Sequence, residues 1–154
     1  MEYLWLKLIH IISATVLFGT GMGIAFFMLR AHLSGDPRLI ATTARSVVIA
    51  DACFTAPAVV VQFLTGLRLV QMMNLPLTHG WVFWALILFV LIGACWLPVV
   101  WLQWRAQKLA EFALAHEQAL PASYFRVMRW WFWLGWPAFL SVIGIFWLMV
   151  MKPS

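Results

Sequence analysis

The stretch that decides the fold is YLWLKLIHIISATVLFGTGMGIAFFML, residues 3–29. Lys7 and His10 are its only basic side chains, and it has no acidic one. About 20 consecutive apolar residues are enough for a helix to cross the hydrocarbon core of a bilayer. We therefore expect a membrane-spanning helix that carries one imidazole, His10, inside the apolar run.

The composition extends this expectation to the whole chain. Hydrophobic residues make up 65% of the 154 residues and charged residues only 10%, with a mean hydropathy of +0.95. So much apolar surface cannot be buried in a core of this size, and a lipid bilayer must cover the rest. Three further apolar segments, 46–72, 81–104 and 130–151, are long enough to span. The sequence predicts an all-α, four-helix integral membrane bundle, with residues 1–154 forming one domain.

Polar sequence between these segments predicts how the helices begin and end. Ser34-Gly35-Asp36-Pro37 is a turn signal, and residues 38–45 are expected to lead helically into 46–72. Pro57 is expected to kink that helix. The helix over 81–104 is expected to continue to about Leu120, with Pro121 ending it, and residues 122–129 are expected to start the last helix.

The basic residues predict the orientation of the chain. In a membrane protein, the charge of short loops mainly sets topology, so the net charge of +5 is not read as a nucleic-acid footprint. The positive-inside rule predicts that both termini lie outside and that the connections after the first and third helices are cytoplasmic. We expect a multi-pass protein of a bacterial cytoplasmic (inner) membrane. The two predicted cytoplasmic connections hold Arg30, Arg38, Arg45, Arg105, Lys108, Arg126 and Arg129, whereas the other side holds Lys7, Arg68 and Lys152.

This topology gathers possible cofactor ligands at the outer end. His10 would lie about two turns below the outer surface, on the same side as His79, Arg68 and Lys7. Neutral imidazole is a good ligand for haem iron, and basic side chains are natural partners of haem propionates. In an α-helix, Gly21 lies on the same face as His10, further along the helix, where it leaves room for a flat ligand. The alternatives are a structural His10, a His79 wetted by lipid headgroups, and glycines that serve only helix packing. His32 and His116 are expected to be surface histidines.

Asp51 is the second polar feature within an apolar segment. It heads a stripe of Thr55, Gln62 and Gly66 at helical spacing. A carboxyl inside the membrane suggests a proton relay, or the lining of a solute or metal path together with Gln62. The alternative is an ion pair at the inner boundary with a basic neighbour, namely Arg45, Arg105 or Arg129.

The N-terminal stretch YLWLKLIHIISATVLFGTGMGIAFFMLRAH, with the length and the four-helix pattern, resembles an uncharacterised family of small bacterial predicted integral membrane proteins. More distantly, its opening is similar to the HemJ-type haem-containing protoporphyrinogen oxidases. That resemblance implies a haem-binding histidine at His10, and Gly80-Trp81 matches a GW that begins the third helix there. The lysine expected after the GW is absent from GWVFWALIL, and Leu17 and Phe26 stand where tryptophan and arginine are expected. The resemblance therefore implies fold and haem more than oxidase activity.

These observations lead to three functional hypotheses. The first is a membrane-embedded protein with haem b and a redox or electron-transfer role, facing a lipid-soluble redox partner and possessing oxidoreductase activity if it is an enzyme. The second is a non-enzymatic accessory or scaffold subunit of a larger membrane complex or of a homo-oligomer. The third is transport of a metal or small solute along Asp51 and Gln62.

Overall fold

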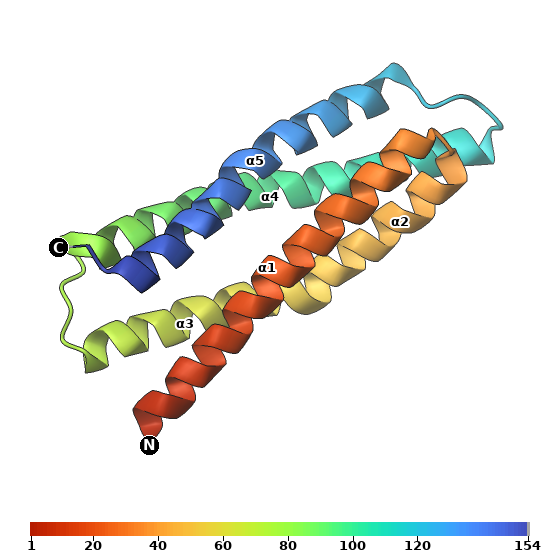
Figure 1. Cartoon of the computed structure of the whole chain (residues 1–154). Coiled ribbons are helices and arrows are strands. Elements are labelled where there is room, and N and C mark those ends of the chain that lie inside the picture. Colours follow the sequence, from red (N-terminus) through yellow and green to blue (C-terminus); the bar gives the residue numbers. More distant parts are fainter. Residues whose placement is uncertain (154) are drawn as a thin grey trace.

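The computed structural model describes residues 1–153, and all regular structure in that range is helical. The elements are α1 (Glu2–Ser34), α2 (Pro37–Ala50), η1 (Asp51–Thr55), α3 (Ala56–Met72), α4 (Gly80–Ala115) and α5 (Ala122–Met151). α2, η1 and α3 follow one another without a break, so the chain forms four long helical rods (Figure 1). All four are long and apolar enough to cross a membrane. The predicted all-α membrane fold is confirmed.

Each predicted span lies inside a longer helix. The first rod ends at a left-handed Gly35 (φ 66°), and the second begins where the Asp36 side chain accepts a hydrogen bond from the Arg38 backbone N–H at 2.9 Å. This is the ordinary way to end one helix and cap the next. The expected extension of the third helix to Leu120 is too long. α4 ends at Ala115, and Glu117 adopts a positive φ of 51° that a helix cannot continue through.

The bend predicted at Pro57 takes the form of a π-turn just before it. η1 covers Asp51–Thr55, and the N–H of Ala56 donates to the carbonyl of Asp51, five residues back. Proline has no N–H and disturbs the preceding turn, and single π-turns within helices are frequent at functional sites. Asp51 therefore lies on the turn where the second rod departs from regular α-helix.

The packing differs between the two halves of the molecule. We call the end with both termini and the α3–α4 connection the terminal end, and the end with the α1–α2 turn and the α4–α5 connection the distal end (Figure 1). In the distal half, α1, α2, α4 and α5 share one core. In the terminal half, the main packing partners are α1 with α3 and α4 with α5. The core comprises Ile24, Met28, Ala31, Ile40, Ala41, Ala44, Val47, Leu102, Ala106, Ala110, Tyr124, Val127, Met128 and Trp131.

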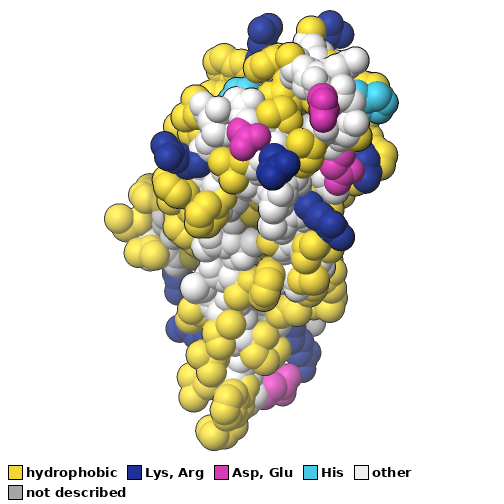
Figure 2. All heavy atoms as spheres, turned by 90° about the vertical axis from the view of Figure 1, so that its right-hand side faces the viewer, with side chains coloured by type: hydrophobic (Ala, Val, Ile, Leu, Met, Phe, Trp, Pro, Cys, Tyr) yellow, Lys and Arg dark blue, Asp and Glu magenta, His cyan; other side chains and the backbone are white. Residues whose placement is uncertain are grey.

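The outside of the rods is apolar along most of its length. Large side chains such as Phe27, Val90 and Trp133 are more than 60% exposed. Viewed toward the distal end, basic and acidic side chains lie among these apolar ones (Figure 2). A soluble protein does not expose this much apolar surface, which agrees with a position in the lipid bilayer.

Candidate functional site

His10 faces α3 and is held by polar side chains from that helix. Its Nδ1 lies 2.8 Å from the Thr65 hydroxyl, and its Nε2 lies 3.0 Å from the Gln62 amide nitrogen. The Ser13 hydroxyl, one turn further along α1, hydrogen-bonds the Gln62 side-chain oxygen and lies 3.0 Å from the His10 backbone carbonyl. Thr65, Gln62 and Ser13 are all buried. We call these four residues the His10 cluster.

The partners of the ring determine where its proton lies. An amide NH₂ group can only donate, so Nε2 must be the nitrogen with the free lone pair. The proton is then on Nδ1 and is donated to Thr65, whose own hydroxyl donates to the Val61 carbonyl at 2.6 Å. In this hydrogen-bond arrangement, Nε2 is the lone-pair nitrogen of the His10 ring.

Gly66 lets the ring approach the backbone of α3. A Cβ at Gly66 would lie 3.1 Å from His10 Cε1, which is closer than side chains normally pack. Gly21, the glycine that the sequence suggested for a ligand, has no atom within 4 Å of its Cβ position, and the same is true of Gly19 and Gly23. Among the described residues these α1 glycines do not pack a neighbouring helix, and the close approach is made by Gly66.

The other residues predicted for the outer cluster lie at the terminal end but do not contact His10 through hydrogen bonds. Arg68 forms an ion pair with Glu2 at 3.0 Å, and both side chains are more than half exposed. Lys7 lies over the Tyr3 ring, 5.9 Å from its centroid. His79 is the exposed residue before α4, and its Nδ1 lies 3.3 Å from the neighbouring Thr78 hydroxyl. Sequence reasoning missed Ser13 and Thr65 as partners of His10, although Gln62 and Gly66 stood out in the polar stripe.

Asp51 forms a second polar cluster in the middle of the molecule. Its Oδ1 accepts a hydrogen bond from Trp96 Nε1 at 3.4 Å. In the amide orientation that satisfies both neighbours, Gln103 donates to Asp51 Oδ2 at 2.7 Å and accepts from Trp131 Nε1 at 3.3 Å. The alternative of an ion pair with Arg45, Arg105 or Arg129 is not found. The ion pairs of residues 1–153 are Arg68–Glu2 and Lys108–Glu111.

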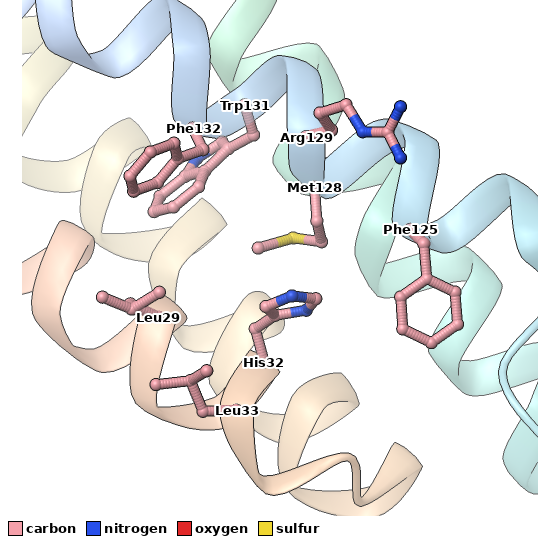
Figure 3. Close-up of a pocket in the computed structure, with 8 residues that line it drawn as sticks. All are labelled: Leu29, His32, Leu33, Phe125, Met128, Arg129, Trp131 and Phe132. Atoms are coloured by element: carbon pink, nitrogen blue, oxygen red, sulfur yellow. The ribbon is translucent and has the colours of Figure 1, made fainter.

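A groove of about 410 Å³ lies between α1 and α5 near the distal end (Figure 3). His32 and Met128 point into it from opposite helices, and the guanidinium of Arg129 points away from them. His32 Nδ1 lies 3.2 Å from the hydroxyl of the fully buried Tyr124. His32 is partly exposed, as expected of a surface histidine, but its ring also packs at the edge of the core. Its position one turn after the buried Met28 is the sequence signal that could have shown this.

Residues 1–153 contain no group of three or more His, Cys, Asp or Glu side chains that could hold a metal ion. A site for a bare metal ion is thus not supported, whereas a haem brings its own four nitrogen ligands and needs only axial ones from the protein.

The sequence profile of a family described as "Predicted integral membrane protein (DUF2269)" matches residues 4–153. The chain belongs to the DUF2269 family. This family is one of predicted integral membrane proteins of unknown function, in agreement with the first resemblance noted above. No curated protein and no solved structure gives a significant match to the chain. The resemblance of this DUF2269 protein to protoporphyrinogen oxidases therefore gains no support from the comparisons.

Proposed function

We propose that this DUF2269 protein is a b-type haem protein of the membrane with a redox role, and that His10 Nε2 is an axial ligand. One observation carries the proposal: the Nδ1–H of His10 is fixed by the Thr65 hydroxyl, which leaves Nε2 as the lone-pair nitrogen. Ligating histidines characteristically donate their second ring N–H in this way, and the donated bond sets the tautomer and orientation of the ring.

The residues around His10 fit one axial ligand. The ring rests against Gly66, where the absent Cβ leaves space for it, and it lies within a segment apolar enough to span the membrane. In the structure Nε2 receives the Gln62 amide, so ligation requires that side chain to rotate away. Ser13, the other partner of Gln62, lies beside it on α1.

Other residues of the terminal end are assigned supporting roles. His79 is the candidate for a second axial ligand because it starts α4 at the same end. Lys7 and Arg68 are candidates for holding propionates, and Arg68 would exchange its exposed ion pair with Glu2 for that purpose. An exposed pair of this kind contributes little to stability, so the exchange costs little.

The chemistry that haem supplies when bound is one-electron transfer. The chain's own residues would hold the haem, with Thr65 orienting the ring of His10. Since the surrounding surface is apolar, a lipid-soluble molecule is the redox partner we expect.

Absorption spectra of the detergent-purified protein, oxidised and then reduced with dithionite, test this proposal. We expect a Soret band that shifts on reduction, with sharp α and β bands, and loss of these bands in His10→Ala. His116→Ala is the matched control, because His116 is exposed beyond the end of α4. Thr65→Val, which keeps the side-chain shape, should weaken haem binding about 10–100-fold through the lost hydrogen bond.

An accessory or scaffold subunit remains the second candidate function. The exposed apolar faces of all four rods favour it, because another membrane protein could cover them as well as lipid. A protein that stays free of haem under haem-rich expression, and that co-purifies with a larger assembly, would replace the redox proposal with this one.

A further inference from the structure

Asp51 lies deep within the molecule. Its side chain is 4% exposed, and its partner Trp96 is near the middle of α4. At 1.5 Å per residue, Trp96 is about 24 Å from the start of α4 and about 29 Å from its end. The carboxyl that Trp96 binds is therefore enclosed by the bundle, far from both ends of α4.

No charged side chain within residues 1–153 neutralises this carboxyl. Its neighbours are neutral: Thr55 on its own rod, Trp96 and Gln103 on α4, and beyond them Trp131 on α5. On α1, the buried residues of the distal core are apolar and include Ile24 and Met28. Arg45, six residues earlier on α2, is exposed and takes no part in the ion pairs of residues 1–153. A permanently ionised carboxylate without a counter-ion is costly inside a membrane, so a proton is the natural partner of Asp51.

The neighbours can serve both the ionised and the protonated carboxyl. The Gln103 amide nitrogen donates to the ionised carboxylate at 2.7 Å, while its oxygen accepts from Trp131. The buried Thr55 hydroxyl lies within hydrogen-bonding reach of Asp51 and has no other partner among the described residues. It is free to accept the proton of the acid form. A group with partners in only one state would not be expected to exchange protons reversibly.

A polar stripe on α4 runs from this carboxyl toward the distal surface. Gln103, Gln107 and Glu111 are four residues apart and so lie on one face of the helix. Gln103 is 1% exposed and Gln107 8%. The amide of Gln107 donates to Glu111 at 2.6 Å, and Glu111 pairs with Lys108 at 2.8 Å where both reach the surface.

The geometry points to a reversible proton-binding site at Asp51 that exchanges its proton with the distal surface along Gln103, Gln107 and Glu111. This site shares no residue with the His10 cluster. The proton-binding proposal can therefore be tested independently of the proposed haem. Gln103 and Gln107 act as positioning residues of the route, and Asp51 is the group that binds the proton.

Labelling with dicyclohexylcarbodiimide tests the site in the unmodified protein. This membrane-soluble reagent adds to a protonated carboxyl, and the O-acylisourea formed rearranges to a stable N-acylurea without any oxidant or reductant. Peptide mass mapping should find the adduct at Asp51 in acid and a progressive loss of it as the pH rises. Asp36, exposed in the α1–α2 turn, is the control: it should react with a water-soluble carbodiimide but not with the apolar one. Absence of the Asp51 adduct at every pH, or an adduct whose yield is independent of pH, overturns the proposal.

Infrared difference spectra between acid and alkaline pH test the site and its route separately. Exposed carboxyls also protonate in acid, so the diagnostic signal is one component of the protonated-carboxyl C=O band, which should be present in the wild type and in Asp36→Asn and absent in Asp51→Asn. After a pH jump the same band should appear severalfold more slowly in Gln107→Leu than in Gln71→Leu, an exposed control on α3. A missing Asp51-dependent band overturns the site, and equal rates in the two glutamine variants overturn the route.

Discussion

Replacing Gln62 with Leu tests the geometry of the His10 cluster. Gln62 is 8% exposed and makes two bonds to α1, one with Ser13 and one with His10. Interhelical hydrogen bonds in a membrane protein average about 0.6 kcal/mol each. The substitution also leaves the lone pair of His10 without a donor, which costs about 1 kcal/mol or more when a group is buried. Leu regains little, because lipid tails are as apolar as Leu itself.

We therefore expect Gln62→Leu to lower the free energy of unfolding by about 1–2 kcal/mol. That corresponds to a change of about 5–30-fold in the folding equilibrium. Titration with sodium dodecyl sulfate in mixed micelles measures this change in the free energy of unfolding. A distance probe between α1 and α3 reports the unfolding. Gln71→Leu is the control, since Gln71 is exposed near the end of α3, and it should change stability by less than about 0.5 kcal/mol. Equal effects of the two substitutions would refute the inference that Gln62 joins α1 to α3.

Three further predictions use the same titration. Gly66→Val should destabilise the chain by about 1–3 kcal/mol through overpacking against the imidazole, whereas Gly21→Val, whose Cβ meets open space, should not; equal losses would contradict the close approach. Tyr124→Ala should lower the free energy of unfolding by about 3–5 kcal/mol because the side chain is fully buried. Tyr124→Phe should lower it by only about 1 kcal/mol, for the lost bond to His32. A small effect of the Ala variant would place Tyr124 outside the core. Glu2→Gln should change stability by less than about 1 kcal/mol, since its ion pair is more than half exposed, and a larger loss would show that the pair is shielded from water.

Much of the fold could be predicted from the sequence because the bilayer imposes a strong constraint. An apolar run of about 20 residues in lipid must satisfy its own backbone, so helices follow directly from length and composition. The positions of helix ends were less predictable. α4 and α5 extend well beyond their apolar spans because their polar turns also pack at the distal end, where Ala106, Ala110 and Tyr124 are buried.

The candidate sites were only partly predictable. The sequence identified His10, Gln62 and Asp51 as polar residues in apolar segments, but it could not assign their partners, which come from other helices. Thr65 carries no distinctive local signal, and its bond to His10 depends on how α1 and α3 rotate about their axes. The same rotation decides that Gly66, and not Gly21, makes the close approach to the imidazole.

The two polar clusters lie at different depths along the same bent rod. Asp51 and Thr55 belong to the π-turn, and Gln62 and Thr65 lie about two turns beyond it on α3. Between Thr55 and Gln62 the buried residue is the apolar Ala58. About two helical turns of the second rod therefore separate the His10 cluster from the proton-binding site proposed at Asp51.

The most direct test of the account is chemical rescue of the proposed haem ligand. His10→Gly removes the imidazole and leaves a space next to Gly66 for a free imidazole molecule. The account predicts that the variant loses the haem absorption bands when purified with haem supplied, and that added imidazole restores them in proportion to its occupancy. Unchanged haem content in His10→Gly, or a wild-type protein that never takes up haem, would contradict the assignment of His10 as an axial ligand.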